Sequence, residues 1–273
     1  MTVPAVPART RSDLALRLIS ALVLIPCALF VVHQGGWWLA SGSAVFAAIM
    51  GFEWCRMSGQ GPMALAAGVL ALANLSFMLV LQGVVPVAWI CAGLGAFAIL
   101  FGALNHRTFS LAVFGMMYAG GLPLALQILR GGPWDGQSAA LILMTIVWAS
   151  DSGAYFAGRG FGGPALSSDS PNKTWSGALG AVICAVLSGA IAAGLMNASL
   201  WLWLAFGAAI SIVAQLGDLA ESQIKRRFGV KDASGFVPGH GGVMDRVDGL
   251  GAVCVIGVAA LLASPVFAGA LGF

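Results

Sequence analysis

Apolar residues form nine long runs along this chain, separated by short polar breaks. The runs cover about residues 14–32, 36–54, 61–82, 84–104, 109–129, 138–157, 175–196, 199–223 and 247–270. A helix needs roughly 20 apolar residues to cross the hydrocarbon core of a bilayer. The runs are continuous rather than alternating, which disfavours a membrane β-barrel. The pattern therefore predicts an all-α, polytopic integral membrane protein with about nine transmembrane helices.

Composition supports a membrane protein and excludes an ordinary soluble domain. Hydrophobic residues make up 59% of the chain and charged residues only 8%, whereas soluble domains carry about 25% charged residues. The five cysteines are scattered without metal-binding or redox spacing, so we interpret them as small buried hydrophobes. The lipid bilayer is the expected surrounding, and no nucleic-acid partner is expected.

The basic residues predict the orientation of the chain in the membrane. With a cytoplasmic N-terminus, every Lys and Arg falls on inside segments except Arg130, as the positive-inside rule requires. An odd number of spans then places the C-terminus outside. We divide the chain into a cytoplasmic tail (1–13), an N-terminal transmembrane region of about five spans (14–135) and a C-terminal catalytic transmembrane region of about four (136–273).

Charge is concentrated in residues 218–248, which hold ten of the chain's 13 basic and 10 acidic side chains. Asp218, Glu221 and Ser222 share one face at the end of a predicted helix. An ionisable group at membrane depth normally faces the protein interior or a water-filled cavity. An ion pair between Glu221 and Lys225, one turn further on, is the simpler alternative for Glu221.

A second acidic pair, Asp245 and Asp248, stands at the start of the last predicted span. Helix capping alone could explain one of these acids. It does not explain four carboxylates together, and such a set from two helices can hold one or two hard cations such as Mg²⁺. The sequence therefore predicts a metal site formed by Asp218, Glu221, Asp245 and Asp248, for metal-assisted phosphoryl or nucleotidyl transfer.

A glycine-rich stretch between the two acidic pairs is a candidate anion site. Gly241 and Gly242 would let backbone amides approach a phosphate closely. His240 could be a base, a phosphate donor or a loop histidine, and these alternatives stay open. The cations that could bind phosphate groups nearby are Lys225, Arg226, Lys231 and Arg246, whereas for Arg227 we prefer a topology signal.

Upstream, Asp151 closes the sixth predicted span, and Lys173 and Thr174 open the seventh, where phosphate binds readily. The glycines around Asp151 could equally serve tight helix packing. We interpret Glu53 as an interfacial pair with Arg56 and Asn74 as an interhelical hydrogen bond, and we assign neither acid nor amide any chemistry.

Residues 222–248 resemble the signature of the phosphatidate cytidylyltransferase (CDP-diacylglycerol synthase) family. The shared pattern is Ser-x-apolar-Lys-Arg, Lys-Asp, His-Gly-Gly and Asp-Arg-apolar-Asp, with the spacing intact. Residues 151–162 and 170–175 also resemble the family, while the first five spans match only in length and hydropathy. One departure is Ser176, where the family usually has Glu.

The resemblance implies that CTP and phosphatidic acid react to CDP-diacylglycerol and pyrophosphate with Mg²⁺, and a second cation and a homodimer are compatible with it. Asp218, Asp245, Asp248, Lys225 and His240 would be catalytic, the first three holding the metal. The substrate-binding residues would be Asp151, Lys173, Thr174, Ser222, Arg226, Lys231, Gly241, Gly242 and Arg246. The expected location is the cytoplasmic membrane of a bacterium.

Two other functions remain as alternatives. A related CTP-dependent transferase could act on an isoprenoid or ether lipid, because the sequence does not specify the lipid tail. A secondary transporter would also explain many spans and buried acids, but it predicts polar residues near the midplane of several helices. Here the polar residues gather at one face. A CDP-alcohol phosphotransferase is disfavoured because its Asp-Gly-x-x-Ala-Arg pattern is absent.

Overall fold

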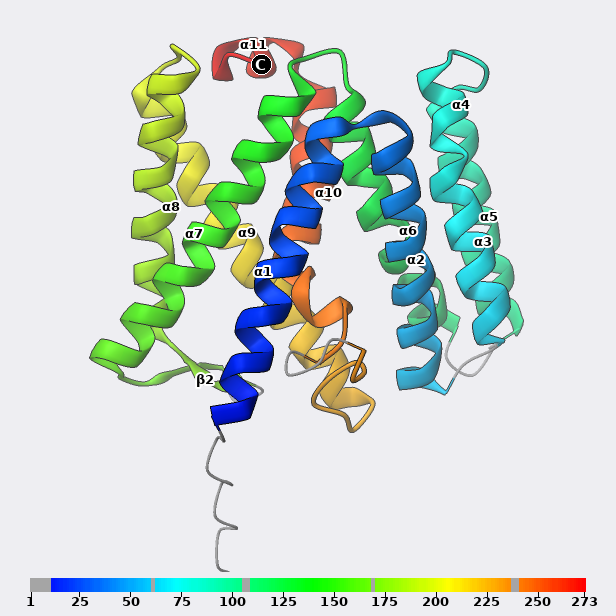
Figure 1. Cartoon of the computed structure of the whole chain (residues 1–273), viewed down its shortest axis with the longest axis horizontal. Coiled ribbons are helices and arrows are strands. Elements are labelled where there is room, and N and C mark those ends of the chain that lie inside the picture. Colours follow the sequence, from blue (N-terminus) through cyan, green and yellow to red (C-terminus); the bar gives the residue numbers. More distant parts are fainter. Residues whose placement is uncertain (1–10, 60–61, 105–108, 168–169, 237–240) are drawn as a thin grey trace, which may run out of the picture.

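The computed structural model describes residues 11–59, 62–104, 109–167, 170–236 and 241–273. The described chain is a bundle of long helices with one small β-hairpin (Figure 1), so the predicted all-α membrane fold is confirmed. The helices are α1 (Arg11–Gln34), α2 (Gly36–Ser58), α3 (Met63–Leu75), α4 (Phe77–Leu81), α5 (Val87–Leu104), α6 (Phe109–Gly131), α7 (Gly136–Phe161), α8 (Trp175–Leu195), α9 (Leu200–Arg227), α10 (Asp248–Ala263) and α11 (Pro265–Leu271). Strands β1 (Ala165–Ser167) and β2 (Ser170–Thr174) pair antiparallel, with Ala165 opposite Thr174, and η2 (Met244–Arg246) is a 3₁₀ turn.

Seven stretches of the described chain are long and apolar enough to cross a membrane, and the bent pair α10–α11 would raise this number to eight. Each of the seven coincides with one of the predicted spans. The predicted span 61–82 corresponds to α3 and α4 together. In α1, the apolar stretch Leu22–Gln34 is shorter than a full span. The count of nine and the orientation of the termini stay predictions.

The last predicted span, 247–270, is not one straight helix. The axis bends by 111° between α10 and α11. Ser264 lies at the break in an extended conformation and accepts a hydrogen bond from the Phe267 amide, and Pro265 occupies the first turn of α11. Ser before Pro is a helix start signal, so the sequence ends α10 and begins a new helix within the apolar run.

The charged part of the chain lies at one end of the bundle. The hairpin, the end of α9 and the start of α10 lie together near the first residues of α1, whereas α11 and the C-terminus lie at the opposite end (Figure 1). Arg130, at the end of α6 that leads to α7, donates hydrogen bonds to the carbonyls of Val32 and His33 at the end of α1. Of the Lys and Arg residues in the described ranges, Arg130 alone lies at that far end.

Two apolar clusters fill the bundle. One is built mainly from α7, α8, α9 and α10 and includes Leu143 and Trp203. The other joins α2, α3, α5 and α6 around Trp54 and also contains Val243 and Met244 from the segment between α9 and α10. The polar segment after α9 is therefore packed against the N-terminal helices, which positions the site described below.

Glycines allow α7 and α8 to pack in backbone contact. A Cβ atom at Gly180 would lie 2.3 Å from Ala157 Cβ and 2.8 Å from the Gly153 carbonyl oxygen, and one at Gly153 would lie 2.5 Å from the Gly180 carbonyl oxygen. The packing interpretation of the glycines near Asp151 therefore holds for Gly153. This contact aligns the end of α7 with the start of α8, where Lys173 and Thr174 lie.

Replacing Gly180 by Ala should destabilise the protein by about 1–3 kcal/mol, because the added methyl group overpacks the α7–α8 contact. The matched control is Gly194→Ala on the same helix, where nothing lies within 4 Å of the added atom. Thermal unfolding in the same detergent should show a lower Tm for Gly180→Ala only. Equal Tm values for the two variants would contradict the importance of this contact.

Candidate active site

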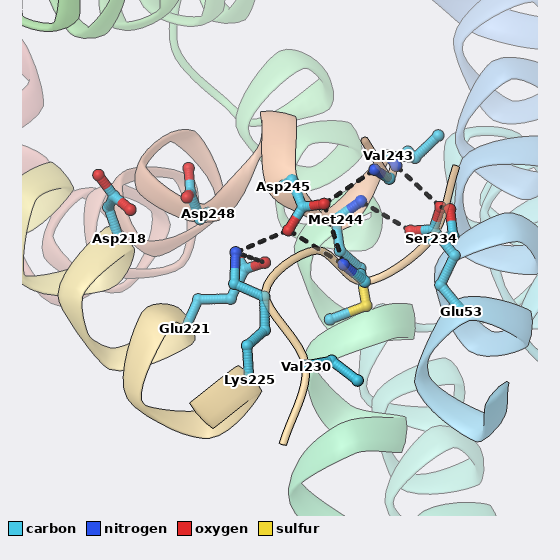
Figure 2. Close-up of polar contacts among 12 residues, drawn as sticks. Glu53, Asp218, Glu221, Lys225, Val230, Ser234, Val243, Met244, Asp245 and Asp248 are labelled. Carbon is cyan, nitrogen blue, oxygen red and sulfur yellow. Dashed lines mark hydrogen bonds and ion pairs between the residues drawn. The ribbon is translucent and has the colours of Figure 1, made fainter. Parts of the chain in front are cut away.

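The crossing of α9 and α10 brings Asp218 and Asp248 together. The two helices approach closely at Gly217, where a Cβ atom would lie 2.7 Å from Ala252 Cβ and 2.9 Å from the Asp248 carbonyl oxygen. The two carboxylates consequently lie next to each other (Figure 2) and within electrostatic range. These are two of the four acids that the sequence predicts to share one site.

Lys173 reaches the same place from the hairpin. Its ammonium group forms an ion pair with the Asp218 carboxylate. The Nζ atom is buried, and among the described residues it has no hydrogen-bond acceptor with normal geometry. Asp151, near the end of α7, lies within electrostatic range of Asp218, Lys173 and Arg246. Residues from α7, β2, α9 and the α10 start therefore form one charged cluster.

The start of α8 is fixed by its own side chains. Thr174 caps the helix, its hydroxyl accepting a hydrogen bond from the Gly177 amide at 3.1 Å. Ser176 donates a hydrogen bond to the Gly162 carbonyl and also contacts the Thr174 hydroxyl at 2.9 Å. At the position where the family resemblance leads one to expect a Glu, this chain therefore has a hydroxyl that ties α8 to the end of α7.

Glu221 and Asp245 lie in a different arrangement, around the buried Lys225. The Lys225 Nζ atom is 2.6 Å from Asp245 Oδ1 and 3.3 Å from Glu221 Oε1 (Figure 2). Tyr118 of α6 donates a hydrogen bond of 3.0 Å to Glu221 Oε2. The alternative ion pair for Glu221 is therefore present, and the prediction that all four carboxylates gather around a metal differs from the structure. Lys225, predicted to bind a substrate phosphate, is instead paired with these two acids.

Asp245 also binds the backbone that surrounds it. Its Oδ2 atom accepts hydrogen bonds from the amides of Gly242 at 2.8 Å and Ala233 at 3.0 Å. Gly241 has φ +86°, a left-handed conformation that favours glycine, and a Cβ there would lie 2.9 Å from Asp245 Oδ2. The Gly242 amide, predicted to bind a substrate anion, is thus directed at an internal carboxylate.

The remaining predicted residues line the outer part of this region. Arg226, Lys231 and Arg246 are exposed, and Ser222 is partly buried on α9. Arg226 donates a hydrogen bond to the Val230 carbonyl at 3.0 Å, so its guanidinium helps to close the turn after α9. His240 lies outside the described residues, and its role stays a prediction.

Sequence reasoning missed Glu53. This residue of α2 is fully buried, and its carboxylate accepts hydrogen bonds from the Ser234 hydroxyl and from the amides of Val243 and Met244. The predicted pair with Arg56 is therefore wrong, since Arg56 is exposed. The predicted interhelical hydrogen bond of Asn74 is confirmed, because its side-chain amide donates to the Gly120 carbonyl of α6 at 3.2 Å.

The donor set bears on whether Mg²⁺ fits. Over the described residues, no three His, Cys, Asp or Glu side chains are arranged to hold a metal ion. Mg²⁺, however, is usually bound by one or two carboxylates together with water and substrate phosphates. The neighbouring carboxylates of Asp218 and Asp248 meet that requirement, whereas those of Glu221 and Asp245 already bind Lys225.

Comparison with known proteins decides the family. The profile described as "Cytidylyltransferase family" matches residues 15–264. The chain belongs to the cytidylyltransferase family. The phosphatidate cytidylyltransferases of Brucella suis biovar 1 and Brucella abortus (strain 2308) are each 38% identical to it over 251 residues, covering 90% of this chain and 92% of theirs. That of Haemophilus influenzae is 41% identical over 139 residues, 48% of each chain.

The match to the cytidylyltransferase family covers much more of the chain than the signature at residues 222–248. The match begins at residue 15 and so includes the N-terminal helices, which at the level of sequence resembled the family only in length and hydropathy. The match therefore covers α2 and α6, the helices that carry Glu53 and Tyr118. The chain is a membrane-embedded enzyme of the cytidylyltransferase type.

Proposed function

We propose that this enzyme transfers the CMP group of CTP to phosphatidic acid at the cytoplasmic face of a bacterial inner membrane, giving CDP-diacylglycerol and pyrophosphate. The relatives named phosphatidate cytidylyltransferase support the reaction. The observation that carries the proposal is the charged cluster of Asp218, Asp248 and Lys173 at one end of an otherwise apolar bundle. The substrates are polyanions, and one of them is confined to the bilayer.

The cations of the cluster fit the phosphate groups of these substrates. Lys173 is half-buried just before the start of α8, and its buried Nζ atom has donors left over after its ion pair with Asp218. A phosphate oxygen would use them. Arg246 is exposed beside Asp151 and can bind a second phosphate group. A phosphate monoester is anionic at neutral pH, so its oxygen can attack the α-phosphorus of CTP without a strong base, and the bond to the β-phosphate breaks.

Asp218 and Asp248 are the residues that would hold Mg²⁺. When bound, the ion would neutralise charge that develops on the phosphate oxygens. Asp151 lies within electrostatic range of the same groups and would help to orient Lys173. We assign Asp245 and Glu221 to holding Lys225 and the adjoining backbone, and not to the metal.

The membrane face follows from the distribution of basic side chains. Arg56 and Arg159 lie in the last turns of α2 and α7, and three further basic residues lie in the last turn of α9. These helix ends lie at the end of the bundle that carries the site (Figure 1). Such an excess is typical of cytoplasmic segments. The positive-inside rule therefore supports a site that opens toward cytoplasmic CTP.

The test is incorporation of CTP labelled in the α-phosphate into lipid by the purified protein in mixed micelles with Mg²⁺. We expect label in a product that requires phosphatidic acid, with one pyrophosphate released per molecule. A polyprenyl phosphate and an archaeal-type ether lipid serve as competing acceptors. Label in one of those lipids alone would replace phosphatidic acid as the substrate, and no label in any lipid would refute the proposed function.

A further inference from the structure

Glu53 is a buried acid that no cation neutralises among the described residues. It is 0% exposed and accepts hydrogen bonds from the Val243 amide at Oε1 and the Met244 amide at Oε2, both of 2.9 Å, and from the Ser234 hydroxyl (Figure 2). Burial of a carboxylate is costly unless strong hydrogen bonds compensate it. Three donors converge on this one carboxyl group, so Glu53 binds the segment tightly.

The amides that Glu53 binds belong to the start of η2, the turn that leads into α10. The first amides of a helical segment have no partner within the segment, and no side chain at Val243 caps η2. The Gly242 amide donates to Asp245, and the next two amides donate to Glu53. Two carboxylates thus bind three consecutive amides, and the one on α2 caps the turn from a different helix.

Gly242 shows how closely the acid and the loop fit together. A Cβ atom at this position would lie 2.9 Å from Glu53 Oε1 and 3.0 Å from Oε2. Real Cβ atoms are rarely so close to a neighbour, and the carboxylate could move away only by giving up its hydrogen bonds. The glycine therefore leaves the space that the Glu53 carboxylate fills.

We propose that Glu53 is a positioning residue of the active site. By holding Val243 and Met244 it fixes the turn after which α10 begins, and so it sets Asp248 beside Asp218. This inference rests on the proposed function, because it treats Asp248 as part of the reacting site. It assigns the N-terminal helices a part in catalysis that their apolar sequence does not suggest.

The first variant is Glu53→Gln, which keeps the size of the side chain but replaces one acceptor oxygen by an NH₂ group facing a backbone N–H. Hydrogen exchange of peptide 241–247 should be faster, and kcat should fall at least about tenfold because small displacements of reacting groups lower turnover strongly. KM for CTP should stay within about threefold, since the substrate-binding cations are intact. Ser58→Ala on the same helix, which removes only a hydrogen bond to Trp54, should change none of these quantities.

A second pair of variants tests the same contact from the other side. Gly242→Ala should push the carboxylate away and lower kcat with Glu53 intact. The double variant should lose little more than either single variant, because both remove one shared interaction. Should Glu53→Gln fail to fold, Gly242→Ala and Ser234→Ala, which removes one of the three donors, carry the same kinetic and exchange tests.

The outcomes separate this inference from the proposed function. A wild-type protein that labels no lipid refutes the proposed function, and the exchange measurement then still decides whether Glu53 anchors the turn. If the wild type is active and the kcat of Glu53→Gln stays within about threefold of the wild-type value, the positioning role is overturned. This holds even if hydrogen exchange of peptide 241–247 is faster in the variant. Unchanged exchange, or kinetic losses that add in the double variant, would also overturn it.

Discussion

Replacing Asp248 by Asn should lower kcat at least about 100-fold while leaving Tm within a few degrees of the wild-type value. The loss is of the size seen when one preorganised electrostatic group is removed from a reacting centre. Stability should be retained, because Asn keeps the shape of the side chain and relieves the repulsion between two adjacent carboxylates, Asp248 and Asp218. Incorporation of labelled CTP and thermal unfolding of the same preparation measure both quantities. Asp218→Asn should behave similarly, with an additional loss of the Lys173 ion pair.

The control addresses the possibility that Asp248 only stabilises the start of α10. Asp135 stands at the start of α7, at the other end of the bundle, and caps that helix by accepting the Ser138 amide at 3.1 Å. Its hydrogen bond from Ser138 lowers the pKa of Asp135 below its ordinary value, so the group is ionised at neutral pH. Asp135→Asn should therefore cost some stability and no activity. If Asp248→Asn gives the same result, Asp248 is a helix cap and not part of the reacting site.

Several features of the fold and the site could be predicted from the sequence because they depend on local patterns. Continuous apolar runs predicted seven spans that the structure contains. The position of Asp218 directly after a long apolar run predicted an acid that faces other parts of the protein, and in the structure Asp218 pairs with Lys173. The interhelical role of Asn74 followed from its isolation within an apolar run. Each of these inferences needs only the neighbouring residues and the nature of the solvent.

What the sequence did not predict depends on contacts between distant segments. Helical spacing placed Asp245 and Asp248 on one face, but it could not show that Lys225 and two backbone amides bind only the first of them. Glu53 is 181 residues away from Ser234 in the sequence, so its nearest cation, Arg56, was the obvious partner. The bend at Ser264 does have a local signal, the Ser-Pro pair at residues 264–265. The prediction followed the continuous apolar run instead and so missed the bend.

The second large effect is expected on stability, from the buried group of three charged residues Lys225, Glu221 and Asp245. The side chains of Lys225, Glu221 and Asp245 are 10%, 3% and 4% exposed. One cation therefore balances two acids in a region that water hardly reaches. Removing one partner of a buried ion pair costs about 3–5 kcal/mol, because the remaining charge has no compensation.

Lys225→Met should accordingly lower the Tm strongly, and in this protein the destabilisation should be at the upper end of that range because two carboxylates lose their counterion. Methionine has nearly the length of lysine, so little packing is lost. Adding Glu221→Gln to Lys225→Met should restore part of the stability, because one of the two uncompensated charges disappears. Thermal unfolding in one detergent across the three proteins measures the effect.

The neighbouring Arg227 supplies the matched control, since it is a basic residue in the same helical turn but exposed. Arg227→Met should change Tm and activity little, as surface charges contribute little to stability. The opposite interpretation, in which Lys225 binds a substrate phosphate, predicts an unchanged Tm and a raised KM for CTP or phosphatidic acid in Lys225→Met. That result would show that Lys225 binds substrate, and it would leave Glu221 and Asp245 available to a metal ion. The Tm of Lys225→Met therefore decides whether these two acids hold Lys225 or a metal ion.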